Sequence, residues 1–97
     1  MFKEGLLNSV YEYLEKIFLI YRNADPKTKK YIREYIDGIT IDGEKGYLVA
    51  KFRKDGITIV DDETGEEKEL EDLRESEVWD LAVDLENLLE ELGGKDV

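Results

Sequence analysis

The segment from Ile39 to Leu70 reads ITIDGEKGYLVAKFRKDGITIVDDETGEEKEL. Three turn signals divide it into four short runs: the two glycines of Gly43–Gly46, the pair Asp55-Gly56 and the pair Thr64-Gly65. Asp-Gly between runs of β-branched residues is a strong hairpin signal. The segment therefore predicts four strands joined in succession by hairpin turns.

The lengths of the turns predict which residues face each other. A four-residue first turn places Ile41 opposite Leu48. A two-residue middle turn at Asp-Gly places Phe52 opposite Ile59, and a two-residue last turn at Thr-Gly places Ile59 opposite Leu70.

These pairings can be tested against each other because side chains of a strand alternate between two faces. They agree, since eight apolar side chains fall on one face: Ile39, Ile41, Leu48, Ala50, Phe52, Ile57, Ile59 and Leu70. One apolar and one mostly polar face is typical of an antiparallel sheet covered on one side. The alternative is a three-residue middle turn with a bulge at Gly56, which would flip the faces of one strand.

Helical periodicity flanks this segment on both sides. Helix one is expected from about Lys3 to Arg22, and Asp25 is expected to cap helix two from Pro26 to about Asp37. Ser76 is expected to cap helix three, which runs to about Leu92. We therefore predict a single α+β domain over residues 1–97 with the order α-α-β-β-β-β-α. Helices one and three pack on one face of a four-stranded antiparallel meander, and helix two bridges or flanks them.

Helix one carries more apolar surface than one stripe needs. Tyr13, Leu19 and Ile20 lie off its main apolar face. A helix of this kind is covered on more than one side. Either the other helices wrap it, or a second copy of the chain does and the protein is a homodimer.

Charge is distributed unevenly along the chain. The net charge is −11 and the isoelectric point is near 4.4. Residues 1–60 hold 11 Lys and Arg and 9 Asp and Glu, whereas residues 61–97 hold 3 and 16. The acidity therefore belongs to the last third of the chain, where it suggests an interaction surface.

Composition argues against several classes of function. Cysteine and histidine are absent, so the chain lacks thiolate nucleophiles, imidazole bases and Cys/His metal sites. We expect no catalytic residues, no cofactor and no metal, and hence a protein that is not an enzyme. The chain has few amide side chains, and 40% of its residues are charged. This composition resembles that of proteins from thermophiles. The sequence shows neither a long apolar run nor a signal-peptide pattern, so we expect a cytoplasmic protein without membrane contact.

The first candidate site is a row of carboxylates on helix three. Helical spacing places Glu77, Asp80, Asp84 and Glu91 opposite its apolar seam. Such a row can steer a basic protein partner to the surface, or imitate the phosphates of DNA and inhibit a DNA-binding protein. The alternatives are a solvated face that keeps a small protein soluble, and internal pairing with the basic helix two.

The second candidate is the polar face of the sheet. Tyr47, Lys51 and Arg53 share it by strand alternation. Basic and aromatic residues on an open sheet can hold single-stranded nucleic acid by charge and stacking. The low isoelectric point disfavours this function because long-range repulsion opposes the approach of a polyanion.

The acidic run Asp61–Glu67 is a third feature. Clustered oxygens can bind Ca²⁺ or Mg²⁺, but the spacing of a calcium loop is not met, because Gly65 is fifth and Asp72 is twelfth. We interpret the run as a charged hairpin tip. The sequence as a whole predicts a small acidic interaction protein that meets a basic partner or itself, with nucleic-acid binding as the alternative.

Overall fold

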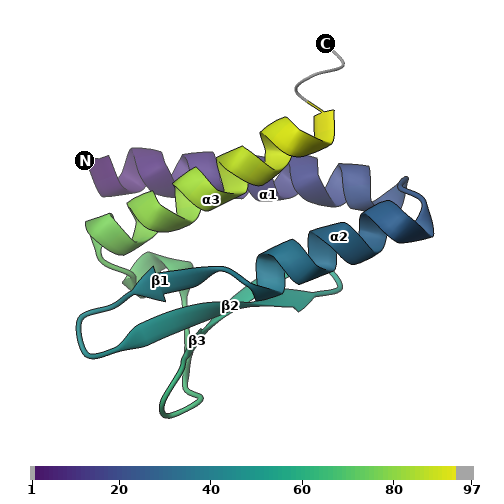
Figure 1. The fold of residues 1–97 in the computed structure, drawn as a ribbon. Coiled ribbons are helices and arrows are strands. Elements are labelled where there is room, and N and C mark those ends of the chain that lie inside the picture. The colour runs from purple at the N-terminus through teal and green to yellow at the C-terminus, as the bar shows by residue number, and fades with distance from the viewer. Residues whose placement is uncertain (1, 94–97) are drawn as a thin grey trace.

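The computed structural model describes residues 2–93. It confirms the α+β class and the order α-α-β-β-β-β-α, with the helices packed on one face of a four-stranded antiparallel sheet (Figure 1). The elements are α1 (Phe2–Arg22), α2 (Pro26–Asp37), β1 (Thr40–Asp42), β2 (Tyr47–Arg53), β3 (Gly56–Asp61), β4 (Glu67–Lys68), the short 3₁₀ helix η1 (Leu70–Asp72) and α3 (Glu75–Gly93).

The first hairpin has the predicted register. Ile41 lies opposite Leu48, and the Gly43 N–H donates to the Gly46 carbonyl at 2.8 Å across a four-residue turn. Gly46 has φ of 151°, a value that glycine tolerates and other residues rarely adopt. The glycine pair therefore closes this turn as the sequence indicates.

The predicted pairing of the middle hairpin is wrong by two residues. Phe52 lies opposite Ile57 rather than Ile59, and Ala50 is the partner of Ile59. The turn is formed by the two residues before Gly56, which has no positive φ and pairs with the last residue of β2. A shift of two leaves every side chain on its predicted face, because the side-chain period of a strand is two.

The last strand is shorter than predicted. Lys68 rather than Leu70 lies opposite Ile59, and Leu70 begins η1. The acidic run lengthens the turn, because the Asp61 carboxylate accepts the Glu63 N–H at 2.8 Å and the Thr64 N–H at 3.0 Å. These backbone bonds also lower the pKa of the Asp61 carboxyl, with the Thr64 bond having the larger effect.

The core lies between the sheet and the helices. Five of the predicted apolar residues are buried: Ile39, Ile41, Leu48, Ala50 and Ile59; Phe52, Ile57 and Leu70 are half-buried at its edge. Phe52 stacks on Phe18 of α1, with 5.4 Å between the ring centroids. The single apolar face predicted for the sheet is therefore confirmed.

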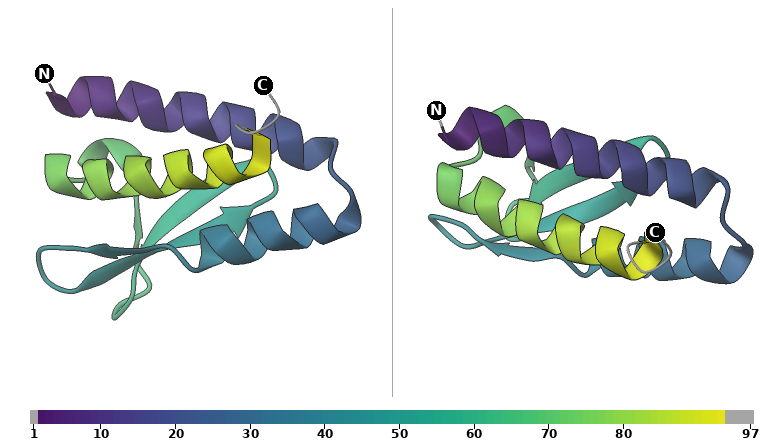
Figure 2. Two further views of the ribbon diagram at one scale, coloured as in Figure 1. Left: turned by 45° about the horizontal axis from the view of Figure 1, so that its top comes forward. Right: turned by 90° about the horizontal axis from the view of Figure 1, so that it is seen from above.

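The helices α1 and α3 run side by side in the same direction above the sheet (Figures 1 and 2). Beside α3 lies α2, which packs on β2. The bounds of α2 are those predicted, and the Asp25 carboxylate accepts the Thr28 N–H at 3.0 Å. Helix two therefore flanks α1 and α3, which is one of the two arrangements predicted for it.

The start of α3 differs from the prediction. The helix begins at Glu75, one residue before the expected cap Ser76. The Arg74 carbonyl accepts the Val78 N–H at 2.9 Å, so Arg74 takes the N-cap position. The Glu77 carboxylate reaches back to accept the Arg74 N–H at 2.8 Å and the Arg74 Nε–H at 3.0 Å. Glu77 thus supplies half of a capping box.

Candidate interaction surfaces

The predicted row of carboxylates on α3 is not one open face. Glu77, expected at the surface, is buried with only 5% of its area exposed, because it caps the helix from the inside. Asp80 and Glu91 are exposed and Asp84 is half-buried. The row lies on the flank of α3 that turns toward α2, so part of it is covered.

Two tyrosines of α2 occupy this flank. The Tyr35 hydroxyl donates to the Asp84 carbonyl at 3.0 Å, and the Tyr31 hydroxyl donates to the Glu91 carboxylate. Burial raises the pKa of the Asp84 carboxyl, and the charge of Asp80 raises it further. The flank therefore helps to hold α2 against α3.

Internal pairing of these acids with the basic side chains of α2 does not occur within the described part of the chain. The ion pairs found between residues 2 and 93 are Glu12–Lys16 at 3.6 Å, Arg53–Glu67 at 4.0 Å and Arg74–Glu77 at 3.0 Å. None of them joins α2 to α3, and the polar contacts between these helices are made by the tyrosine hydroxyls rather than by lysines, as one alternative would have required.

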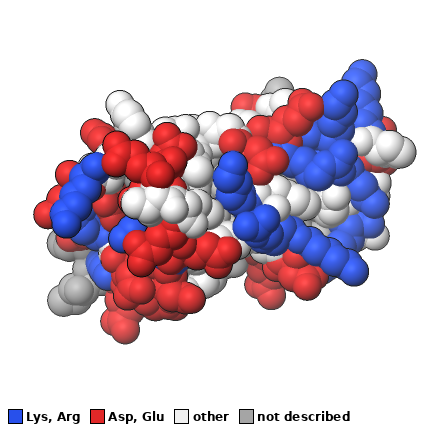
Figure 3. Space-filling model, turned by 90° about the horizontal axis from the view of Figure 1, so that it is seen from below, with Lys and Arg blue, Asp and Glu red and all other residues white. Residues whose placement is uncertain are grey.

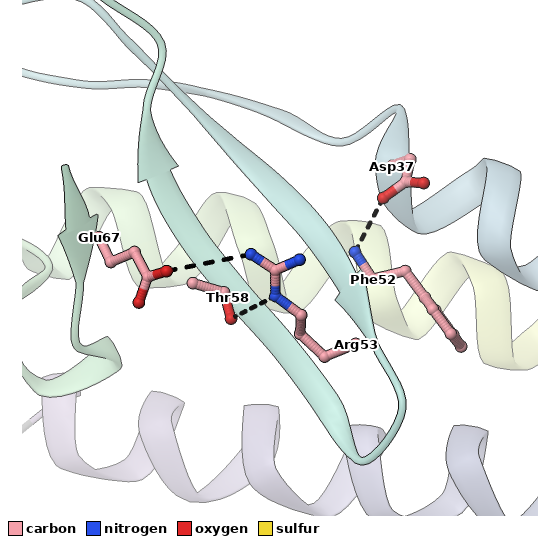
Figure 4. A network of polar contacts seen from close by, with 5 residues as sticks. All are labelled: Asp37, Phe52, Arg53, Thr58 and Glu67. Carbon is pink, nitrogen blue, oxygen red and sulfur yellow. Dashed lines mark hydrogen bonds and ion pairs between the residues drawn. The ribbon is translucent and has the colours of Figure 1, made fainter. Parts of the chain in front are cut away.

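The residues of the second candidate lie together on the polar face of the sheet. Tyr47 is 56% exposed, and Lys51 and Arg53 are exposed on the same side. The Arg53 guanidinium donates to Thr58 Oγ1 at 3.1 Å and lies 4.0 Å from the Glu67 carboxylate (Figure 4). Arg53 of β2 is thus partly neutralised by a carboxylate of β4, which lies beyond β3 in the sheet.

The two signs of charge are separated along the molecule. Seen from below, Lys and Arg gather mainly toward the α2 end, and Asp and Glu dominate the opposite end (Figure 3). This separation gives the sheet side a dipole but leaves carboxylates close to the basic groups.

A third surface includes the second side of helix one that the sequence predicted to be covered, by other helices or by a second copy, without assigning site residues to it. Among residues 2–93, no other helix or strand covers the outer side of α1 and α3, away from the sheet (Figure 2). Between the two helices lies an open hollow of about 520 Å³, lined by Tyr13, Lys16, Leu19, Ile20, Glu86, Leu89, Glu90 and Gly93. We call this side, together with Trp79 and Val83, the α1/α3 surface.

Large apolar side chains are exposed on the α1/α3 surface. Leu19 is 54% exposed, Trp79 57% and Val83 38%. Trp79, Val83, Glu86 and Glu90 share one side of α3, because residues three and four apart are neighbours on a helix. Exposed apolar side chains therefore continue along α3 beyond the hollow, at Val83 and Trp79. The sequence signal was the surplus of apolar residues on helix one, which includes Tyr13, Leu19 and Ile20.

Carboxylates edge the α1/α3 surface. Glu86 and Glu90 line the hollow from α3, and Lys16 is the one cation among its lining residues. Burial raises the pKa of the Tyr13 hydroxyl, and the charges of Glu86, Glu12 and Glu90 add to the effect. The surface thus has an apolar floor and a mixed but mainly acidic rim.

Two further hollows are less apolar. One of about 490 Å³ lies between α1 and the β2–β3 turn and has Glu15, Arg22 and Asp55 among its lining residues. The other, of about 240 Å³, lies between the first hairpin and the start of α3 and is lined mainly by charged side chains.

Within residues 2–93, no group of three or more acidic residues is arranged to hold a metal ion. In the same part of the chain, no helix is both long enough and apolar enough to cross a bilayer. Comparison of the chain with models of protein families, with curated proteins and with solved structures finds no match.

Proposed function

We propose that this protein is a non-enzymatic protein–protein interaction module and that its contact surface is the α1/α3 surface. The observation that carries the proposal is an apolar hollow between two helices, with Leu19 more than half exposed at its edge and Trp79 more than half exposed nearer the start of α3. Exposed apolar side chains gathered on one side of a monomer mark interaction sites.

The energetic argument rests on these exposed side chains. Moving the exposed parts of Leu19 and Trp79 out of water contributes about 1–2 kcal/mol each. Both residues sit on helices held by the core, so little conformational entropy is lost when a partner binds. Rigidly held apolar side chains of this kind have the properties of an interface centre.

The acidic residues support a secondary role in the same function. Asp80 and Glu91 stay exposed on the flank of α3, and Glu86 and Glu90 edge the hollow. Together with a net charge of −11, they favour the approach of a basic surface. We therefore propose that the apolar side chains of this surface hold the partner, and that the carboxylates speed the approach only of a partner whose own surface is basic.

The test is affinity capture of a tagged chain from cells that encode it, followed by identification of the captured proteins. L19E places a charge at the edge of the hollow. Y47E adds the same charge at an equally exposed position, 56% against 54%, on the other side of the molecule. We expect the wild type and Y47E to capture the same identified protein, whether another chain or an untagged copy of this one, and L19E to lose it. Capture of nothing by the wild type, or equal capture by L19E, would contradict the proposal.

Nucleic-acid binding by the sheet is the second candidate, because Tyr47, Lys51 and Arg53 are exposed together. The test is anisotropy of labelled single-stranded DNA and RNA in a salt series. This candidate predicts binding at about 0.05 M salt that weakens steeply with added salt. It also predicts loss of binding in Y47A/K51A but not in the α2 control K27A. Absence of binding at low salt removes this candidate.

A further inference from the structure

We infer that the occupant of the α1/α3 surface is a second copy of the same chain, related by a two-fold axis. This inference rests on the function proposed above and names its partner. A two-fold interface brings the same patch of both copies together, so the patch must be complementary to itself. Three properties of the α1/α3 surface meet this requirement.

The first property is that a projection and a recess occur side by side. Leu19 stands 54% exposed at the rim of the hollow. The recess has Leu89 and Ile20 in its lining, and a Cβ added at Gly93 would lie 3.9 Å from Ile20 Cδ1. In a two-fold pair, Leu19 of each copy can enter the recess of the other.

The second property is the available area. The helices α1 and α3 contain 21 and 19 residues. At ~1.5 Å per residue they are ~30 Å long, and two helices packed side by side present a width of ~20 Å. This gives ~600 Å² for each copy and ~1,200 Å² in total, which is the lower limit for stable specific interfaces. The pair of helices is therefore large enough for a dimer, whereas the hollow alone is not.

The third property is that both signs of charge occur on the patch. Lys16 lies among the lining residues together with Glu86 and Glu90. In a two-fold pair, Lys16 of each copy can meet a glutamate of the other. The excess of acids lies elsewhere, at the hairpin tip and on the flank facing α2, so the patch itself is nearer to neutral than the molecule.

The net charge of −11 on each copy predicts how salt acts. Like net charges repel at long range, and salt screens this repulsion. Dimerisation through apolar side chains therefore strengthens as salt is added. Docking of a basic partner on the acidic residues would weaken under the same change.

The experiment is light scattering coupled to gel filtration on the full chain, from about 5 to about 500 µM and at about 0.05 and 0.5 M salt. We expect the wild type to reach the mass of a dimer, at lower protein concentration in high salt. L19E should raise the dissociation constant at least ~100-fold, because a charge replaces an apolar side chain in the contact. Y47E, with the same added charge, should change it by less than ~3-fold. L19A, which cannot harm the helix, should raise it ~10-fold.

A wild type that stays monomeric at about 500 µM in both salts overturns the inference. So does a dimer that Y47E disrupts and that L19E and L19A leave intact. The two levels of the account fail separately. If the protein is a strict monomer but captures a different protein through Leu19, the inference of a dimer is wrong and the proposed interaction function stands. If the protein is a monomer and captures nothing, both the dimer and the interaction function are contradicted.

Discussion

Glu77 is a charged residue that stabilises the fold from a buried position, although glutamate is usually found at the surface. Its carboxylate accepts both the backbone N–H and the side-chain Nε–H of Arg74, so a charge that is almost fully buried is satisfied by two bonds. The N-cap residue Arg74 has no side-chain acceptor of its own. Glu77 is therefore the group that closes the N-terminus of α3.

Removing this carboxylate should destabilise the protein. We expect E77A to lower the free energy of unfolding by about 2 kcal/mol, because a cap and a charge-assisted hydrogen bond are lost together. The control E75A removes an exposed acid of the same turn and should cost less than ~0.5 kcal/mol. Urea unfolding followed by circular dichroism measures both. If E77A and E75A have equal free energies of unfolding, the capping contact of Glu77 contributes nothing to stability.

Tyr11 and Glu71 form a second residue-scale contact, in which the Tyr11 hydroxyl donates to the Glu71 carboxylate. This bond, with smaller effects of burial and charge, raises the pKa of Tyr11 to about 12, and it lowers the pKa of Glu71. The stabilising effect of a raised tyrosine pKa is complete below the ordinary value near 10 and is lost as pH rises toward 12. The effect of the lowered Glu71 pKa is present above the ordinary carboxyl value and is lost as the pH falls through the lowered pKa.

Ultraviolet titration of the phenol groups tests this contact. We expect one tyrosine to titrate near pH 12 in the wild type, to vanish in Y11F and to return toward its ordinary pKa in E71Q. A titration curve that E71Q leaves unchanged would mean that the bond to Glu71 does not set the pKa of Tyr11.

Local side-chain chemistry was predictable where it depends on neighbours in sequence. Asp25 and Pro26 identified the start of α2 correctly, because a cap acts over three residues. Glu77 was placed wrongly, because helical spacing alone cannot tell a solvated acid from one that bends back to its own N-cap. The sequence did hold a signal, since a Glu at the third helical position is typical of a capping box.

At the scale of elements, α2 and β2 are joined beyond the end of β1. The Asp37 carboxylate accepts the Phe52 N–H at 2.8 Å (Figure 4). The bond takes the place of a ladder bond that β1 would supply if it began earlier. The end of α2 therefore completes the edge of the sheet.

This contact predicts a measurable effect. D37A should lower the free energy of unfolding by about 1–2 kcal/mol, because the Phe52 N–H loses a charged acceptor. D42A, an exposed acid at the other end of β1, should cost less than ~0.5 kcal/mol. Thermal unfolding compares them, and amide exchange of Phe52 should quicken in D37A alone. Unchanged exchange at Phe52 would contradict the assignment.

The order of the elements and the apolar face of the sheet could be predicted from the sequence, whereas the residue-by-residue pairing of the strands could not. The apolar face of the sheet was predicted correctly although the registers of the middle and last hairpins are displaced by two residues. A displacement of two leaves each side chain on the same face. The pairing itself depends on which residues form each turn. Gly56 pairs with Arg53 where the Asp-Gly pattern suggested a turn position, so Phe52 lies opposite Ile57. Turn composition alone does not distinguish these two arrangements.

At the scale of the whole molecule, acidity is not balanced by ion pairs. The chain has 25 Asp and Glu against 14 Lys and Arg. The three ion pairs within residues 2–93 involve at least one well-exposed partner each. Exposed pairs of this kind contribute little stability. Self-repulsion among the carboxylates therefore dominates the electrostatics of the folded state.

Salt should therefore stabilise the fold. We expect the free energy of unfolding to rise by about 1 kcal/mol between ~0.01 and ~0.3 M KCl, as repulsion is screened. Urea unfolding at low protein concentration measures this without a contribution from dimers. A fall in stability over the same range would show that specific ion pairs outweigh the general repulsion.

The α1/α3 surface could be predicted only in part. The surplus apolar residues of helix one indicated that a second side of it is covered, and Leu19 and Ile20 do lie at the hollow. The position of the hollow depends on which flank of α3 packs against α1, and this is decided by the sheet beneath both helices. Long-range packing of this kind leaves no local pattern in the sequence.

Trp79 offers the most direct measurement of the central claim, because it is the single tryptophan of the chain and lies on the α1/α3 surface. Acrylamide is uncharged, so quenching of Trp79 emission reports access rather than charge. We predict that quenching falls several-fold as the wild-type protein is concentrated from about 5 to about 500 µM, and that it stays high in L19E. Quenching that is the same at every concentration of the wild type would show that this side of the helices remains open to water, and would contradict the account.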